Sequence, residues 1–219
     1  MRGVWAIGMV GLMLAGCSGK PDTSADMERG EAARKAGDDD LAIACFDRVI
    51  RVDPACAKAW ALRGSCKALS GDHQSAIRDG SEAIRLEPNN GDWLCHRAMT
   101  YIISKRLDDA ESDASRAESL EPSAFAKAVL AHVYMSRDQY DTAIAKARAA
   151  VSDSPDHVYA RRILAESLAR KARRIYTPAN RNESISLLKE AIQTWPDSNF
   201  RERFVSGCED DIRRYSEGT

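Results

Sequence analysis

The sequence predicts an all-α fold, a solenoid of about five stacked helix pairs closed by a C-terminal capping helix. Two observations carry this prediction: prolines recur with a period of 34 residues, and small residues recur at fixed distances before them. The composition agrees, because charged residues make up 30% of the chain and aromatic residues, which favour strands, only 6%. The 219 residues can bury a core, and a formal net charge of −1 does not attract nucleic acid.

Residues 1–16 have the pattern of a cleaved export signal. Arg2 supplies a positive charge, and an apolar run over residues 4–14 follows it. A bilayer-spanning helix needs about 20 residues, so this run is too short to stay in the membrane as an anchor. The segment ends in Leu-Ala-Gly-Cys17, which resembles the signal of bacterial lipoproteins. The resemblance implies cleavage before Cys17 and acylation of that residue, including with palmitate; the alternative is an ordinary signal with an incidental cysteine.

Residues 17–24 are expected to form the lipidated cysteine and a short tether. The residues after Cys17 are small, polar or helix-breaking, as in flexible linkers. Seven such residues reach about 25 Å at most, so the folded part would lie close to a membrane surface. Ser18 resembles the residue that sorts lipoproteins to the outer membrane. We therefore expect a bacterial cell-envelope protein, on the periplasmic face of the outer membrane in preference to the inner membrane.

Five prolines mark the ends of the repeats. Pro54, Pro88 and Pro122 are 34 residues apart, Pro155 follows after 33 residues and Pro196 after 41. Each proline ends an amphipathic run, because a proline inside a helix removes a backbone hydrogen bond. A non-repetitive helical bundle does not explain this spacing. The solenoid is expected over residues 25–197, with repeats at about 23–56, 57–90, 91–123, 124–156 and 157–197.

Small residues occupy matching positions in the repeats and allow paired helices to approach closely. The residues 12 positions before successive prolines are Ala42, Ala76, Ala110 and Ala143. The second copy has the fullest motif, which consists of Trp60, Gly64, Ala76, Ala83 and Pro88. This motif resembles the tetratricopeptide repeat (TPR) family. The resemblance implies a right-handed α-solenoid that binds other proteins and has no enzymatic activity.

The fifth copy and the end of the chain depart from the regular repeat. The fifth copy has seven extra residues, which we place between its two helices, around Pro178. The segment 198–219 has apolar residues at helical spacing among charged ones, which predicts an amphipathic helix. A solenoid needs its last repeat covered by a helix with a polar outer face, so we interpret this segment as a capping helix and tail.

The TPR resemblance also implies that the first helix of each pair lines a concave groove. Its apolar, methionine-containing centre and polar ends would suit an amphipathic helix or an extended peptide. The positions carried over to this groove are Ala61, Ser65, Asp92, Cys95, Met99, Ile102, Phe125, Ala128, His132, Met135, Tyr159 and Arg162. For each of them the alternative is a place in the core. The Lys and Asn that hold carboxylate tails in some TPR proteins are missing, so we expect no clamp of that kind.

Residues 161–181 carry a local excess of about six positive charges. The basic patch that we predict here consists of Arg161, Arg170, Lys171, Arg173 and Arg174. One interpretation is a surface for anionic lipid or an acidic partner. The other is a solvated helix end, with cations near the negative end of the helix dipole.

Catalysis and metal binding find no support in the sequence. The five cysteines besides Cys17 lack the short spacings of zinc or redox motifs, so we expect buried thiols, with Cys66 and Cys95 as the candidate disulfide. The four histidines are scattered, and there is no phosphate loop or nucleophile elbow. We therefore expect no cofactor, metal, nucleic acid or small-molecule substrate.

These expectations combine into one leading function. The chain is predicted to be a membrane-anchored scaffold or assembly adaptor of the bacterial cell envelope that binds a protein or peptide client in its groove. One alternative is an accessory subunit or regulator of a cell-wall enzyme. An unrecognised enzyme is a further alternative.

Overall fold

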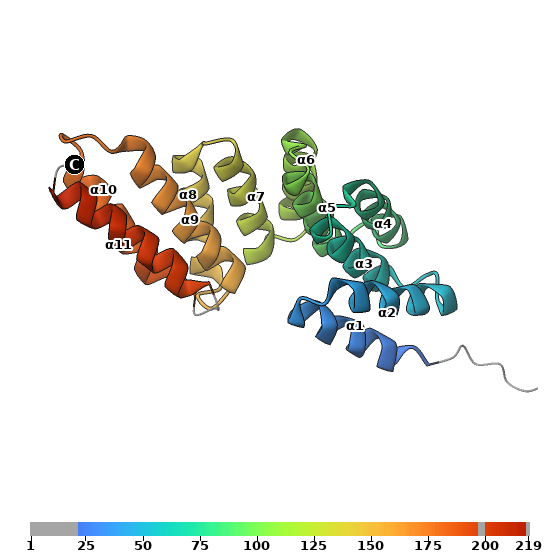
Figure 1. Ribbon diagram of the computed structural model, residues 1–219. Helices are drawn as coiled ribbons and strands as arrows, with labels where there is room; N and C mark the ends of the chain where they lie inside the picture. The colour runs from blue at the N-terminus through green and yellow to red at the C-terminus, as the bar shows by residue number, and fades with distance from the viewer. Residues whose placement is uncertain (1–21, 197–199, 218–219) are drawn as a thin grey trace, which may run out of the picture.

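The computed structural model describes residues 22–196 and 200–217, and all regular structure in these ranges is helical (Figure 1). Ten helices form five sequential pairs: α1 (Ser24–Ala36) with α2 (Asp39–Val52), α3 (Ala57–Leu69) with α4 (His73–Leu86), α5 (Gly91–Ile103) with α6 (Leu107–Leu120), α7 (Ala124–Ser136) with α8 (Tyr140–Asp153), and α9 (Val158–Ile175) with α10 (Arg181–Thr194). The last helix, α11 (Arg201–Glu217), follows them. The predicted all-α solenoid is confirmed.

The predicted N-terminal signal and Cys17 lie outside the described residues. Of the predicted tether, Asp22 and Thr23 precede the first helix and Ser24 begins it. Within the described ranges, no helix combines the length and the apolar character that crossing a bilayer requires.

A left-handed residue closes the turn inside each of the first four pairs. Gly37 and Gly71 have φ angles of 80° and 91° there. Lys105 and Asp138 take the same place in the third and fourth pairs, with φ angles of 63° and 59°. A side chain makes this conformation unfavourable, so the repeat imposes the turn geometry even where the residue is not glycine.

Small residues bring the two helices of a pair together, as predicted. A Cβ atom on Gly30 would lie 2.7 Å from Cε1 of Phe46, so only glycine fits under this ring. On Gly64 it would lie 3.0 Å from the backbone oxygen of Ala76. The aligned alanines are also fully buried, at 1% exposure or less: they are Ala42, Ala76, Ala110 and Ala143.

The pairs follow one another along a curved stack, and each packs on the next (Figure 1). The first helices also contact one another, α3 with α5, α5 with α7 and α7 with α9, so they form an inner layer. The core is accordingly a series of local clusters, the largest of which joins α7 to α11. This layer positions the groove described below.

The extra residues of the fifth pair mainly lengthen its first helix. α9 has 18 residues where α1, α3, α5 and α7 have 13, and the loop over residues 176–180 takes up the remainder. This differs from the prediction, which places the whole insertion between the helices; the residues before Pro178 are good helix formers and continue α9. The extension reaches α11, where Tyr176 stacks on Tyr215 with ring centroids 3.6 Å apart.

α11 covers the last pair, as predicted. Its residue Phe204 stacks on Trp195 at 3.8 Å, and the side chain of Cys208 is fully buried. Nε of Arg173, in the extension of α9, donates a hydrogen bond to Asp211 at 2.6 Å. The solenoid therefore ends on a helix that is tied to both helices of the fifth pair.

Candidate binding groove

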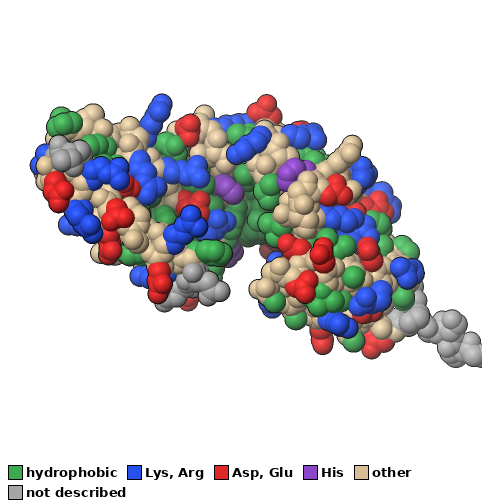
Figure 2. All heavy atoms as spheres, in the orientation of Figure 1, with side chains coloured by type: hydrophobic (Ala, Val, Ile, Leu, Met, Phe, Trp, Pro, Cys, Tyr) green, Lys and Arg blue, Asp and Glu red, His purple; other side chains and the backbone are tan. Residues whose placement is uncertain are grey.

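The first helices bring half of the predicted groove residues to the surface of one face. The residues with partly exposed side chains there are Ser65, Met99, Phe125, His132, Tyr159 and Arg162. In Figure 2 a hollow separates the two halves of the molecule, and apolar side chains and histidines gather in it. The surface at the centre of the stack is therefore apolar and recessed.

Five other predicted groove residues lie in the core. They are Ala61, Cys95, Ile102, Ala128 and Met135, with exposures of 4% or less. Ala61 clusters with Ala83 of α4, and Ala128 clusters with Ala150 of α8 and Ala160 of α9, so these positions lie between packed helices. We therefore leave them out of the groove.

A row of rings crosses this face from α5 through α7 to α9. Trp93 and His96 have ring centroids 5.9 Å apart, and His96 and Phe125 follow at 5.8 Å. Phe125 and Tyr159 are 6.0 Å apart in an edge-to-face arrangement. Such pairs favour fixed relative orientations, so the row gives the groove a firm aromatic floor.

Two histidines on this floor are held neutral. Nδ1 of His96 lies 3.0 Å from Oγ of Ser65, and Nδ1 of His132 lies 2.8 Å from the hydroxyl of Tyr159. Burial lowers the pKa of both imidazoles to about 4, and the nearby Arg34 adds to the effect on His96. Burial likewise raises the pKa of Tyr159. The floor is therefore polar at a few atoms but uncharged at neutral pH.

A cavity of about 110 Å³ opens into this face among α1, α3 and α5. Its lining consists of Arg34, Ser65, Ala68, Leu69, His96, Met99, Thr100 and Ile103. Leu69 and Ile103 are 66% and 41% exposed, so their side chains form an open apolar rim to the cavity. Arg34, Leu69, His96 and Ile103 were not among the predicted groove residues. Leu69 and Ile103 each end a first helix and are one repeat apart, which was a usable signal.

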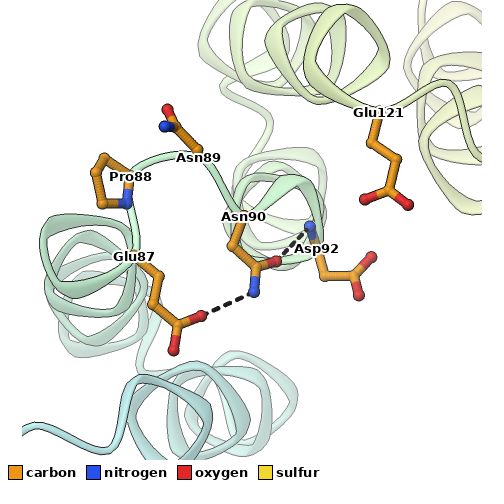
Figure 3. Close-up of a pocket in the computed structure, with 6 residues that line it drawn as sticks. All are labelled: Glu87, Pro88, Asn89, Asn90, Asp92 and Glu121. Atoms are coloured by element: carbon orange, nitrogen blue, oxygen red, sulfur yellow. Dashed lines mark hydrogen bonds between the residues drawn. The ribbon is translucent and has the colours of Figure 1, made fainter.

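A wider hollow of about 490 Å³ lies by the loop between α4 and α5 (Figure 3). Nδ2 of Asn90 donates to Glu87 at 2.8 Å, and Oδ1 of Asn90 accepts from the backbone nitrogen of Asp92 at 3.0 Å. These bonds hold the loop and the start of α5. The predicted groove residue Asp92 thus lies in the first turn of α5, beside this polar loop. Among the described residues, no group of His, Cys, Asp or Glu could hold a metal ion.

The predicted basic patch divides into two groups. Arg161 donates to the backbone oxygen of Thr194 at 3.1 Å, and Lys171 and Arg173 each lie 2.6 Å from a carboxylate. These three tie α9 to its neighbours. The two that project without an ion-pair partner among the described residues are Arg170 and Arg174.

Two further ion pairs, one between α3 and α4 and one between α5 and α6, were not predicted from the sequence. Arg63 and Asp79 are joined by two hydrogen bonds of 2.8 and 2.7 Å, and Arg97 and Asp113 by two of 2.7 and 2.8 Å. Both aspartates are buried. A Cβ atom on Gly80 would lie 3.1 Å from Cβ of Arg97, so the small residue makes room for the second pair. The same spacing of 16 residues in two successive repeats was the missed signal.

The cysteines of the described ranges are free thiols, so the candidate disulfide between Cys66 and Cys95 is absent. Burial raises the pKa of both thiols to about 12, and that of Cys208 to about 11. A thiol with so high a pKa is a poor nucleophile at neutral pH. These three residues therefore act as small core side chains.

Comparison with known proteins identifies the architecture. The sequence profile of the family described as Tetratricopeptide repeat matches residues 27–91 and 129–174. TTC0263, a thermophilic TPR protein of Thermus thermophilus, is 18% identical with a TM-score of 0.73, over 86% of this chain and 99% of that one. YrrB, described as a TPR protein with an unusual peptide-binding site, is 18% identical with a TM-score of 0.52, over 86% and 92% of the two chains. A MamA fragment from Desulfovibrio magneticus RS-1 is 16% identical with a TM-score of 0.58, over 80% and 97%. At these identities the structures show a shared fold.

Proposed function

This chain belongs to the tetratricopeptide repeat family, and from that premise we propose that it is a non-catalytic scaffold or assembly adaptor that binds a protein client in its concave groove. The observation that carries the proposal is the cavity whose exposed rim includes Leu69 and Ile103. An apolar recess with polar surroundings suits an amphipathic helix or an extended peptide. The peptide-binding site named for YrrB, a protein of the same architecture, supports this choice.

The chemistry of the groove favours binding over catalysis. Its imidazoles have pKa values far below neutrality, which removes them as general bases poised near pH 7. The thiols nearest to it are buried and have raised pKa values. What the groove offers a partner is a shaped, largely neutral surface.

We propose further that the chain works at a membrane surface of the bacterial cell envelope. The support is the lipoprotein-like motif that ends at Cys17, and the short distance in sequence from Cys17 to Ser24, where α1 begins. A tether of this length keeps the groove near the lipid surface, so the client would be a membrane protein or an envelope protein.

The anchor is tested by replacing its cysteine. Cys17→Ser should abolish incorporation of labelled palmitate and move the chain from the membrane fraction to the soluble fraction. Cys56→Ser removes another cysteine, partly exposed at the start of α3, and should change neither result. Labelled palmitate on the Cys17→Ser protein would contradict the proposal.

The groove is tested by adding a charge to its floor. A photo-crosslinking amino acid in place of Phe125 should capture the client in intact cells, and Met99→Glu should reduce the capture at least tenfold. Ser115→Glu adds the same charge to an exposed position of α6 and should leave capture unchanged. Circular dichroism should show equal helical content in all three proteins. Undiminished capture of the same client by the Met99→Glu protein would overturn the assignment of the groove.

A further inference from the structure

The cavity among α1, α3 and α5 has one cation in an otherwise uncharged lining. Its apolar wall consists of Ala68, Leu69, Met99 and Ile103. Ser65, Thr100 and the neutral His96 supply its polar atoms, and Arg34 supplies its charge. No carboxylate is among the residues that line it. A complementary ligand therefore has both an aliphatic group and a negative charge.

Arg34 is short of partners in the folded chain. Its Nε atom is buried and has no hydrogen bond, and its guanidinium forms no ion pair with the described residues. Glu31, three residues before Arg34 on α1, pairs with Lys58 at 2.5 Å. A buried donor without an acceptor is unfavourable, so an acceptor brought by a ligand would satisfy it.

Building on the proposed function, we propose that this cavity receives one aliphatic side chain of an acidic amphipathic client, and that a carboxylate of the client pairs with Arg34. The volume agrees, because an apolar cavity of about 150 Å³ holds a benzene molecule, and this one is about 110 Å³. The aliphatic group and the carboxylate must lie close together in the client, as they do three or four residues apart on a helix. Charge complementarity of this kind selects among partners that are otherwise similarly apolar.

A peptide library tests the inference without knowledge of the natural client. The full-length chain, purified in detergent and immobilised, is used to select from a random 12-residue library displayed on phage. Peptides enriched by the wild-type chain should carry Asp or Glu close to Leu, Ile or Met. Peptides enriched by the Arg34→Glu chain should carry Lys or Arg instead. A misfolded chain could lose binding, but it would not acquire this new preference for basic peptides. Arg51→Glu, at an exposed arginine near the end of α2, should select the same peptides as the wild-type chain.

Fluorescence anisotropy with one selected peptide completes the test. Replacing its acidic residue by the neutral amide should weaken binding to the wild-type chain at least tenfold and leave binding to Arg34→Gln unchanged. If selected peptides depend on Met99 but show no preference for acidic residues, the role of Arg34 is overturned and the proposed groove stands. If no selected peptide loses binding with Met99→Glu, the inference and the proposed groove are both wrong.

Discussion

Single residues tie the two helices of a pair together through buried ion pairs. Arg97 on α5 holds Asp113 on α6 through two hydrogen bonds, and Nη1 of Arg97 also donates to Ser81 on α4 at 3.0 Å. One side chain thus joins three consecutive helices. Removing one partner of such a pair leaves the other charge buried without compensation, which is costly.

We expect Asp113→Ala to lower the free energy of unfolding by about 3 kcal/mol, because it leaves the largely buried guanidinium of Arg97 without its carboxylate partner. Asp109→Ala removes the partner of Arg106 from an ion pair whose side chains are about half exposed, so it should cost less than about 1 kcal/mol. Urea unfolding followed by circular dichroism measures both. An equal loss in the two variants would show that burial does not set the value of these pairs.

A double replacement separates packing from charge. Arg97→Met combined with Asp113→Leu removes both charges and keeps apolar volume, so it should recover most of the stability lost in Asp113→Ala. A double variant that is less stable than the single one would show that the ion pair itself is favourable here.

The neutral histidines of the groove make stability depend on pH. The pKa of His96 and of His132 is about 4 in the folded chain and about 6.5 in an unfolded one. Between these values the unfolded chain binds protons that the native chain does not. The free energy of unfolding should therefore fall as the pH is lowered from about 6.5 to about 4, by up to about 1.4 kcal/mol per pH unit for each histidine.

The combined variant His96→Gln, His132→Gln should reduce this slope. Urea unfolding at a series of pH values measures the slope. The useful range is between about pH 7 and about pH 5, because most carboxylates stay ionised there. Equal slopes in the wild-type chain and the double variant would contradict the assignment of the slope to these two groups.

At the scale of elements, close approach within a pair depends on small residues. We expect Gly64→Ala to lower the free energy of unfolding by about 1–3 kcal/mol, because the new Cβ would lie 3.0 Å from the backbone oxygen of Ala76 and would push α3 from α4. In Gly91→Ala the nearest atom, the backbone oxygen of Ala117, is 3.5 Å away, which is an ordinary contact. That variant should be unchanged or more stable by up to about 1 kcal/mol. Equal losses in the two variants would rule out the steric explanation.

The length of an individual helix can depart from the repeat, as it does in α9. The 34-residue period places α1 to α8 correctly, since each proline and each turn recurs in register. The longer α9 has no equivalent among the other described helix pairs, so the proline spacing showed that the fifth repeat has extra residues but not that most of them lengthen α9. The structure gives the extra turn a role, because Arg173 in it and Tyr176 just after it contact α11.

At the scale of the whole molecule, most contacts lie within a pair or between consecutive pairs, so stability should be largely local. A chain that ends at residue 196 lacks α11 and uncovers Trp195 and Tyr176. We expect amide exchange to accelerate strongly in α9 and α10 and to stay unchanged from α1 to α6. Hydrogen exchange with mass spectrometry gives this resolution, and Tyr215→Ala, which removes one stack, should produce a smaller change in the same helices. Faster exchange throughout α1 to α6 would contradict local stability.

The groove shows how far the sequence pattern reaches. Met99, Phe125 and His132 were predicted on the concave face and contribute to the partly exposed surface there. Cys95 and Ala128 were predicted beside them and are buried. Both outcomes come from the same repeat register, because the register fixes the side of a helix on which a residue lies. How much of that side the next helix covers depends on the angle and distance between pairs.

The sequence by itself determined the helix pairs, their period and their order, because prolines, turn residues and small residues act locally and repeat. The proposed lipid site at Cys17 also comes from the sequence alone, through a motif that is read in the linear chain. Only the tertiary structure decided that Arg34, Leu69, His96 and Ile103 share one cavity, and that Arg97 and Asp113 form a buried pair. These groups meet across different helices, and their distances are set by the packing of entire pairs rather than by any local preference.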